Sequence, residues 1–570
     1  MMLGQMKNAI SWLCGLGLFV LLMSVLSPDM MREASVTIAT TAEPTAVVAP
    51  IGLAQRAGDR SVILHWEPVS NSDLSGYRIY RSASSESLFE PRHASLLTTN
   101  HFVDFEVEND HTYHYRVRAV DVTGQESGDS ETISATPNGL DAEAFLDLVQ
   151  QTAFDYFWYE ANPANGLIKD RNTKHAPASI AAVGFGLSAL TIGVDRGWIS
   201  REAGRQRVHT TLSFFWNSTQ SPEPDATGYK GFYYHFLDMQ TGRRTWDSEL
   251  STIDTALLLS GMLHVQQYFD RDHLEEIEIR SLVDALYHRV EWTWMQVRAP
   301  KISHGWKPET GFIRDDWEGY NEAMILYLIA LGSPTDPVNP DAWTAWTSTY
   351  TWETHYGYDF VTFPPLFGHQ YSHGWIDFRH LSDAYMRAKG IDYFENSRRA
   401  TLANRAYAID NPQNWSAYGE NVWGLTASDI PTGYSARGAA PAFRDDGTIT
   451  PTAAGGSFVF TPYESQTALR YMYSTYRTKL WGPYGFKDAF NPSANWFAAD
   501  YIGIDQGPFA LMIENHRTGR VWDMFMQNAA IQRGLEQAGF VRLEKVAKSQ
   551  TTTVISMMEA KRERTGESGK

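Results

Sequence analysis

The sequence is nearly free of cysteine, poor in positive charge, and contains one long hydrophobic run. Its single cysteine is Cys14, so the chain beyond that residue has neither a disulfide nor a thiol nucleophile. The 48 Lys and Arg residues are outnumbered by 66 Asp and Glu, giving a formal charge of −18. Because nucleic-acid binding needs a concentrated basic face, this balance argues against a nucleic-acid partner.

The hydrophobic run lies at the N-terminus. Lys7 precedes an apolar stretch from Ile10 to Leu26, and Pro28 follows it. This layout is typical of a secretory signal, and the run is also nearly long enough to span a bilayer. Residues 1–32 are therefore expected to be a signal peptide or a membrane anchor, and the protein is expected to be exported to the periplasm or another location outside the cytoplasm.

Aromatic residues, in contrast, are abundant. The 19 Trp, 28 Tyr and 28 Phe make up 13% of the 570 residues, and many stand beside Gly, Asn, His or Asp. Such a mixture suits a groove in which sugar rings stack on aromatic planes while polar groups bind their hydroxyls. Large hydrophobic cores also use many aromatics, so composition alone leaves both interpretations open.

The sequence pattern changes along the chain, which is long enough for two or more domains. Residues 33–49 have the composition of a linker. Residues 50–137 contain short alternating segments such as "SVILHWEPV" between polar turns, which predicts an all-β sandwich. Residues 138–545 carry apolar residues at helical spacing in about ten to twelve segments, and residues 546–570 form a polar tail.

The β-rich segment resembles a fibronectin type III domain. The resemblance is carried by Trp66, by the pair Tyr77 and Tyr80, and by the strand with Tyr113 and Tyr115 that continues into "AVDVTGQES". Such modules act as spacers or docking surfaces, so no chemistry is assigned to this segment.

The helical segment predicts helical hairpins closed into a ring, an α/α barrel with a cleft built by the loops at one end. Acids stand at the expected helix starts: Asp254, Glu322, Glu464 and Asp505, the last before Pro508, which is expected at a first helical position. Any one of them could simply cap its helix and interact with the helix dipole. The inner helices of such a barrel run parallel, so their N-terminal acids would converge.

Converging acids suit hydrolysis of a glycosidic bond. That reaction needs one protonated carboxyl to donate to the leaving oxygen and one carboxylate to act on water or on the anomeric carbon. Burial keeps a carboxyl protonated near neutrality, and Asp254 and Glu322 are each followed by a nearly unbroken apolar run. The stretches "DRN" at 170–172 and "SARGAA" at 435–440 are expected to be loops of the same cleft.

Five motifs carry a family resemblance: "TWDSELSTIDTALLLSG", "WEGYNEAMILYLIALGSPTDP", "FPPLFGHQYSHGWIDFR", "YGENVWGLTASDIPTGY" and "GIDQGPFALMIENHRTG". Together they look like the glycoamylase-like family, most like the bacterial endo-β-1,2-glucanases of glycoside hydrolase family 144. The resemblance implies an (α/α)6 barrel and inverting, endo-acting hydrolysis of β-1,2-glucan to short sophorooligosaccharides without a metal. No cofactor is expected, and the protein is expected to be a monomer.

Within these motifs, Glu322 is predicted to be the proton donor, and Asp254 and Glu249 are predicted to position or activate water. The division of acid and base roles among them stays open. His369 and His373 have the spacing of a helical metal pair, but a hydroxyl-binding or structural role is favoured. Substrate binding is predicted for Asp377, Glu420, Asp505, Tyr320, Trp317, His373, Trp375, Trp423 and Tyr371.

Three alternatives stay open. The first is a related hydrolase with exo action or another linkage, including a β-glucosidase or a transglycosylase. The second is a glucan-binding envelope protein without catalysis, which the presence of all three acids disfavours. The third is a polysaccharide lyase, which would need a basic cluster for a uronate and a Tyr or His base, and which the acidic chain fits less well.

Overall fold

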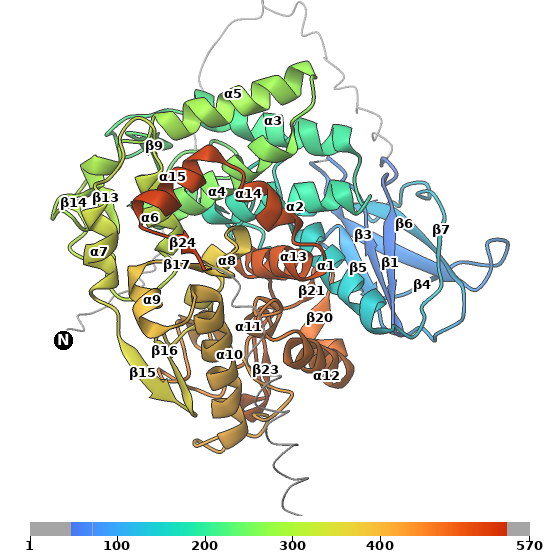
Figure 1. Cartoon of the computed structure of the whole chain (residues 1–570). Helices are drawn as coiled ribbons and strands as arrows, with labels where there is room; N and C mark the ends of the chain where they lie inside the picture. Colours follow the sequence, from blue (N-terminus) through green and yellow to red (C-terminus); the bar gives the residue numbers. More distant parts are fainter. Residues whose placement is uncertain (1–46, 71, 544–570) are drawn as a thin grey trace, which may run out of the picture. The chain divides into compact units, whose positions relative to one another are not determined.

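The computed structural model describes residues 47–70 and 72–543 (Figure 1). The predicted signal or anchor, most of the linker and the polar tail lie outside these residues. Within the described ranges, no helix combines the length and the apolar character needed to cross a membrane.

The first seven strands form two antiparallel sheets, ordered β1-β2-β5 and β4-β3-β6-β7. Val62 and Leu64 of one sheet share a core with Ile79 and Val117 of the other, so the sheets pack face to face. The strands are β1 (Ala54–Gly58), β2 (Ser61–His65), β3 (Leu74–Ser82), β4 (Glu90–Pro91), β5 (His101–Asp104), β6 (Tyr113–Asp121) and β7 (Ile133–Ala135).

Helices dominate the described chain after this β region. There are more of them than the sequence predicts, because five contain seven residues or fewer. They are α1 (Ala142–Tyr159), α2 (Ile180–Asp195), α3 (Arg201–Asn217), α4 (Thr252–Tyr268), α5 (Leu274–His288), α6 (Met324–Leu331), α7 (Asp341–Thr347), α8 (Tyr371–Trp375), α9 (Ala384–Lys389), α10 (Tyr393–Asp410), α11 (Pro451–Gly455), α12 (Pro462–Leu480), α13 (Gly503–Arg517), α14 (Arg520–Phe525) and α15 (Ala529–Gln537).

Short strands and three 3-10 helices fill the long connections. The largest of the small sheets, ordered β14-β13-β12-β10-β9, leads directly into α4. The strands are β8 (Ala178–Ser179), β9 (Gly228–Tyr229), β10 (Phe232–Tyr234), β11 (Phe236–Leu237), β12 (Leu250–Ser251), β13 (Gly305–Lys307), β14 (Gly311–Phe312), β15 (Trp352–His355), β16 (Tyr358–Val361), β17 (Leu381–Ser382), β18 (Ser428–Ile430), β19 (Gly433–Ser435), β20 (Trp481–Gly482), β21 (Gly485–Phe486), β22 (Phe490–Asn491), β23 (Trp496–Phe497) and β24 (Val541–Arg542). The 3-10 helices are η1 (Trp292–Met295), η2 (Leu366–His369) and η3 (Pro492–Ala494).

Helices α2 and α4 pack backbone to backbone at the centre of the helical region. A Cβ atom on Gly184 would lie 2.2 Å from the carbonyl oxygen of Leu257, and one on Gly261 would lie 2.1 Å from that of Gly184. Both helices are buried nearly all round, as expected for helices without a polar face. This contact fixes the position of α4 against α2, and Asp254 lies in the first turn of α4.

The β region is joined to the helices by polar and aromatic contacts. Arg56 forms a 3.2 Å ion pair with Asp155 of α1, whose side chain is 1% exposed. His65 stacks on Tyr159 with ring centroids 4.3 Å apart, and its Nε2 lies 3.2 Å from the carbonyl oxygen of Pro483. These contacts give the two regions a shared buried interface.

Some expectations about the helices were wrong. Glu322 lies two residues before α6 rather than in its first turn, and Pro508 lies inside α13 rather than at its first position. Proline removes one backbone donor from a helix, and the buried packing of α13 offsets that loss. Glu464 and Asp505 do lie in the first turns of α12 and α13. Helices α3 and α10 have a weak apolar pattern, because charged residues interrupt it.

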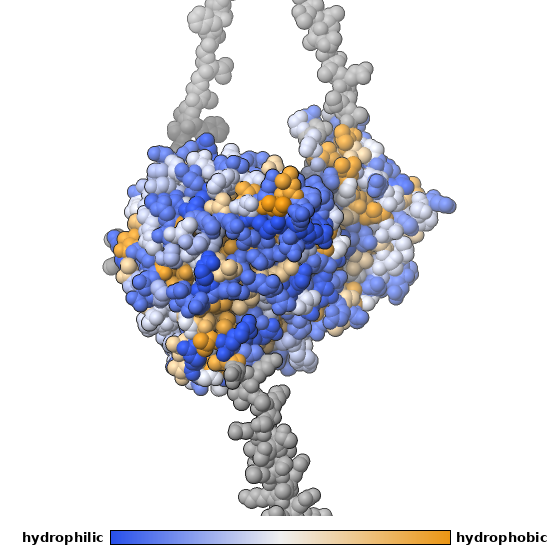
Figure 2. Space-filling view, turned by 45° about the horizontal axis from the view of Figure 1, so that its top comes forward, coloured by the Kyte–Doolittle hydropathy of each residue, from blue (hydrophilic) through white to orange (hydrophobic). Residues whose placement is uncertain are grey.

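Figure 2 shows one face of the molecule, on which polar residues dominate and hydrophobic residues form small, separate patches.

Candidate active site

The first element of the site is the start of α4. The hydroxyl of Ser251 accepts a hydrogen bond from the backbone N–H of Asp254 at 3.1 Å and donates one to its Oδ2 at 2.5 Å. The buried indole of Trp317 donates to the hydroxyl of Thr252 at 2.9 Å. The capping box therefore holds the Asp254 carboxylate, and Trp317 supports the helix start.

His235, between β10 and β11, joins two of the predicted catalytic acids. Its Nδ1 lies 3.0 Å from Oε1 of Glu249 and 3.6 Å from Oδ2 of Asp254. Burial lowers the pKa of His235, but the two carboxylates outweigh that effect and raise it to about 9. The imidazole is thus a cation at neutral pH, and its hydrogen bond contributes to the lowered pKa of Glu249, against the opposing effect of burial.

Ligand atoms of His235, Glu249 and Asp254 lie within 4.8 Å of one another, and among the described residues this is the only group of that kind able to hold a metal ion. With His235 protonated, its Nδ1 has no lone pair to offer and the three groups form an ion-paired cluster; His235 would have to lose this proton to become a metal ligand. His369 and His373, the pair singled out by spacing, are buried and neutral, since burial lowers the pKa of each to about 3.

Glu322 lies next to this cluster. Its Oε2 atom is buried and has no hydrogen-bond partner among the described residues. Burial raises its pKa from 4.5 to about 7, and the negative charge of Asp254 adds to the rise. The Ser372 hydroxyl of α8 donates to the Glu322 carbonyl and accepts from the Ile325 N–H, which fixes the backbone that carries this carboxyl. Glu322 can therefore donate a proton near neutral pH.

A second group of acids surrounds the start of α13. Burial and the neighbouring Asp488 raise the pKa of Asp505 well above its ordinary value, and burial also raises that of Asp488. The backbone N–H of Asp429 donates to Asp488 at 2.6 Å. Arg171 bridges Asp429 and Asp500 at 3.2 and 3.1 Å. Since close carboxyls cannot all ionise, Asp505 and Asp488 share a proton.

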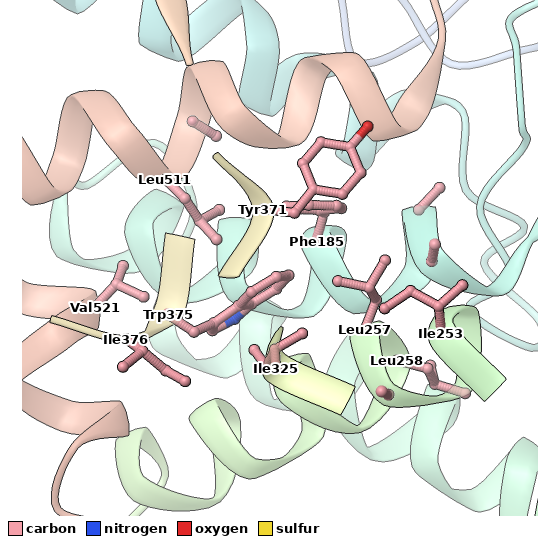
Figure 3. Packing of buried hydrophobic residues seen from close by; sticks show 14 of the residues in the cluster. Phe185, Ile253, Leu257, Leu258, Ile325, Tyr371, Trp375, Ile376, Leu511 and Val521 are labelled. Atoms are coloured by element: carbon pink, nitrogen blue, oxygen red, sulfur yellow. The ribbon is translucent and has the colours of Figure 1, made fainter. Parts of the chain in front are cut away.

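Tyr371 and Asp170 connect the two groups of acids. The pKa of Tyr371 is raised well above its ordinary value by burial and by the charges of Asp505, Glu322 and Asp254. Figure 3 shows its hydroxyl pointing away from the apolar cluster around Trp375. Burial raises the pKa of Asp170, with a smaller contribution from Asp254. The two groups therefore belong to one acidic site, and Asp170 of the "DRN" stretch is part of it.

Two of the predicted substrate-binding carboxylates have other partners. Asp377 forms a bidentate pair with Arg379, at the opposite end of α8 from Tyr371. Glu420 pairs with Arg405 at 3.0 Å and its side chain is 73% exposed. Neither carboxylate is among the charges that shift the pKa of Glu322 or of Asp505.

Most of the predicted sugar-binding aromatics are enclosed by protein. The indole N–H of Trp375 donates to the hydroxyl of Ser188 at 2.8 Å. Tyr320, His373, Trp375 and Trp423 are no more than 1% exposed. The charges of Asp505, Glu322 and Asp254 add to the raised pKa of Tyr371, and the indole of Trp317 is bonded to Thr252, two residues before Asp254.

The sequence analysis missed His235, Asp429 and Asp488. His235 lies in "FYYHFLD", where one polar ring interrupts an aromatic strand, and Asp429 lies in a motif that was quoted for the family resemblance. Asp488 lies in a loop without any periodic pattern, so no signal in the sequence indicated it.

Comparisons with known proteins show which family the chain resembles. The Glycoamylase family model matches residues 314–529. The exo β-1,2-glucooligosaccharide sophorohydrolase (non-reducing end) of Parabacteroides distasonis is 33% identical over 527 residues, covering 86% of this chain and 71% of the relative.

Two solved structures of β-1,2-glucanases are also similar to this chain. A β-1,2-glucanase from Parabacteroides distasonis matches with a TM-score of 0.77 at 33% identity, over 87% of this chain and 73% of that one. The endo-β-1,2-glucanase from Chitinophaga pinensis, solved with sophorotriose and glucose, has a TM-score of 0.66 at 31% identity, over 71% of this chain and 99% of that one.

A helical fold with buried, unpaired carboxyls in one site defines the class of this protein, which is a glycoside hydrolase. The chain belongs to the glycoamylase-like family and is a homologue of β-1,2-glucanases.

Proposed function

We propose that the protein hydrolyses β-1,2-glucan by acid–base catalysis with inversion. The observation that carries the proposal is Glu322, a carboxyl with a pKa of about 7 and a free Oε2 in a site that also holds Asp505 and Asp254. The activities of the relatives on β-1,2-linked glucans support the β-1,2 linkage.

Glu322 donates the proton to the leaving oxygen. Inverting enzymes hold their two carboxyl groups farther apart than retaining enzymes do, which leaves room for water. Asp254 adds to the raised pKa of Glu322, whereas Asp505 makes no such contribution; the charges of Asp505 and Glu322 both add to the raised pKa of Tyr371. We therefore assign the base to the pair of Asp505 and Asp488, which shares one proton and so keeps one carboxylate that can accept a proton from water. Asp254 helps to keep Glu322 protonated, and Asp254 and Glu249 together hold His235. The sequence had favoured Asp254 and Glu249 as the acids that act on water.

Several further properties belong to the proposal. The helical region forms an (α/α)6 barrel, and the β region is a spacer of the fibronectin type III kind. The protein is exported, works outside the cytoplasm without a metal, and acts as a monomer.

Endo action on polymeric glucan to give short sophorooligosaccharides is the first candidate. Exo action is the second, and one observation favours it: the exo-acting relative matches 86% of this chain, whereas the endo-acting structure matches 71%.

The test is product analysis of the full chain on linear β-1,2-, β-1,3-, β-1,4- and α-1,4-glucans. Endo action predicts a broad ladder of β-1,2-oligosaccharides at early times, and exo action predicts one short product from the start. Cleavage of another linkage would show that β-1,2-glucan is not the substrate. Binding without cleavage would favour the alternative of a glucan-binding protein without catalysis.

A further inference from the structure

Trp246 is a large exposed aromatic residue that the catalytic proposal does not use. Among the described tryptophans, only Trp216 and Trp246 are largely exposed, at 43% and 62%. The guanidinium of Arg289 covers the ring of Trp216 at 5.3 Å. Trp246 stands three residues before Glu249 in the chain.

The turn that carries Trp246 is strained and firmly anchored. Trp246 and Asp247 have φ values of 59° and 50°, a left-handed conformation that costs free energy in residues other than glycine. Nε of Arg244 donates to the Ser248 carbonyl at 2.6 Å, and the Thr245 N–H donates to the Phe236 carbonyl at 3.1 Å. Bonds on both sides thus hold the backbone of the turn that exposes Trp246, and strain of this kind concentrates at functional sites.

Aromatic contacts connect Trp246 to the acidic site. Its ring centroid lies 5.1 Å from that of Phe236, which in turn stacks on His235 at 3.9 Å. His235 is the cation that joins Glu249 and Asp254. The exposed indole is therefore two ring contacts away from the proposed catalytic machinery.

A cavity of about 570 Å³ lies against Trp246. Its volume is within the range of small-molecule sites. No ion pair of Lys174 occurs within the described part of the chain, so its ammonium group is available to a ligand. The polar side chains in the lining include Asn162, Lys174, His175, Asp238 and Gln240. One flat apolar ring beside amide and charged groups suits a sugar, whose C–H face stacks while its hydroxyls take hydrogen bonds.

We propose that Trp246 and this cavity form a distal subsite that binds glucose units of the glucan chain beyond those at the acids. The inference rests on the proposed function, since it names where the rest of that substrate lies. The subsite increases affinity for long chains and has no part in bond cleavage.

The test compares kcat and KM of the wild type, Trp246→Ala and Trp246→Asn on polymeric β-1,2-glucan and on a short β-1,2-oligosaccharide. Trp216→Ala is the matched control, because it removes an exposed indole elsewhere. Asparagine tolerates the left-handed backbone better than tryptophan does, so the second variant loses the ring while keeping the turn. Thermal unfolding checks that each variant is folded.

Both Trp246 variants are expected to raise KM for the polymer about three- to tenfold, the range that loss of one aromatic contact would give. Their kcat, their kinetics on the short oligosaccharide, and all values for Trp216→Ala should stay near wild type. Equal losses on both substrates, or none on the polymer, would overturn the inference. If the wild type binds β-1,2-glucan without cleaving it, the proposed function fails, and the same variants then test the subsite through binding affinity. If it neither binds nor cleaves the glucan, both fail.

Discussion

Replacing Glu322 with glutamine should make the protein more stable at high pH while it removes the proton donor. The pKa of this carboxyl is about 7 in the folded protein, against an ordinary value of 4.5. Between these values the folded state binds more protons than the unfolded state, so stability falls as pH rises through this range. The loss is complete above pH 7.

The size of the effect follows from the same values. One pKa unit corresponds to about 1.4 kcal/mol, so ionising Glu322 costs the folded protein at most about 3 kcal/mol above pH 7, given a pKa raised from 4.5 to about 7. Glutamine carries no charge at any pH. Glu322→Gln should therefore recover most of this free energy near pH 8.5 and almost none near pH 4.

The assay is the thermal midpoint of the wild type and of Glu322→Gln across this pH range. Glu464→Gln is the matched control, because it changes a carboxyl at another helix start and reports the effect of the exchange itself. A stability difference between wild type and Glu322→Gln that stays constant with pH would refute the assignment of a raised pKa to Glu322.

Three further predictions follow from the remaining groups. His235→Asn should lower kcat about tenfold and shift the basic limb of the pH–rate profile, because Asp254, whose charge helps to set the pKa of Glu322, loses its cation. His355→Asn, at a surface pair, is the control, and an unchanged profile would contradict the positioning role. Asp505→Asn should lower kcat by about 100-fold or more with glucan affinity retained, and a change in KM alone would remove it as the base. Arg56→Ala should destabilise the protein by about 3 kcal/mol, because the Asp155 side chain is 1% exposed and loses its partner. Adding Asp155→Asn to this variant should restore part of the lost thermal midpoint. An unchanged midpoint in Arg56→Ala would show that the ion pair adds no stability.

The sequence predicted those parts of the molecule that depend on neighbours along the chain. The apolar run after Asp254 predicted a buried helix, and Asp254 lies in the first turn of that helix, as the sequence predicted. The acids Glu322 and Asp505 were singled out because they stand near helix starts, which is a local pattern. These predictions needed only periodicity and capping chemistry.

The sequence could not predict contacts between distant segments. His235 and Glu249 meet because β10 and β12 pair, and Asp488 reaches Asp505 through a loop without periodicity. Trp375 was predicted to bind sugar because of its polar neighbours in sequence, but its indole N–H has an internal acceptor, Ser188. Whether a tryptophan is buried or open depends on such tertiary partners, which a single sequence does not reveal.

The most direct test of the central claim is the release of new reducing ends from linear β-1,2-glucan by the wild type, Glu322→Gln and Glu464→Gln. The wild type and Glu464→Gln should cleave the glucan at similar rates. Glu322→Gln should be folded, should bind the glucan, and should cleave it at least about 100-fold more slowly. Cleavage by Glu322→Gln at the wild-type rate would contradict the assignment of Glu322 as the acid, and no cleavage by the wild type would contradict the function itself.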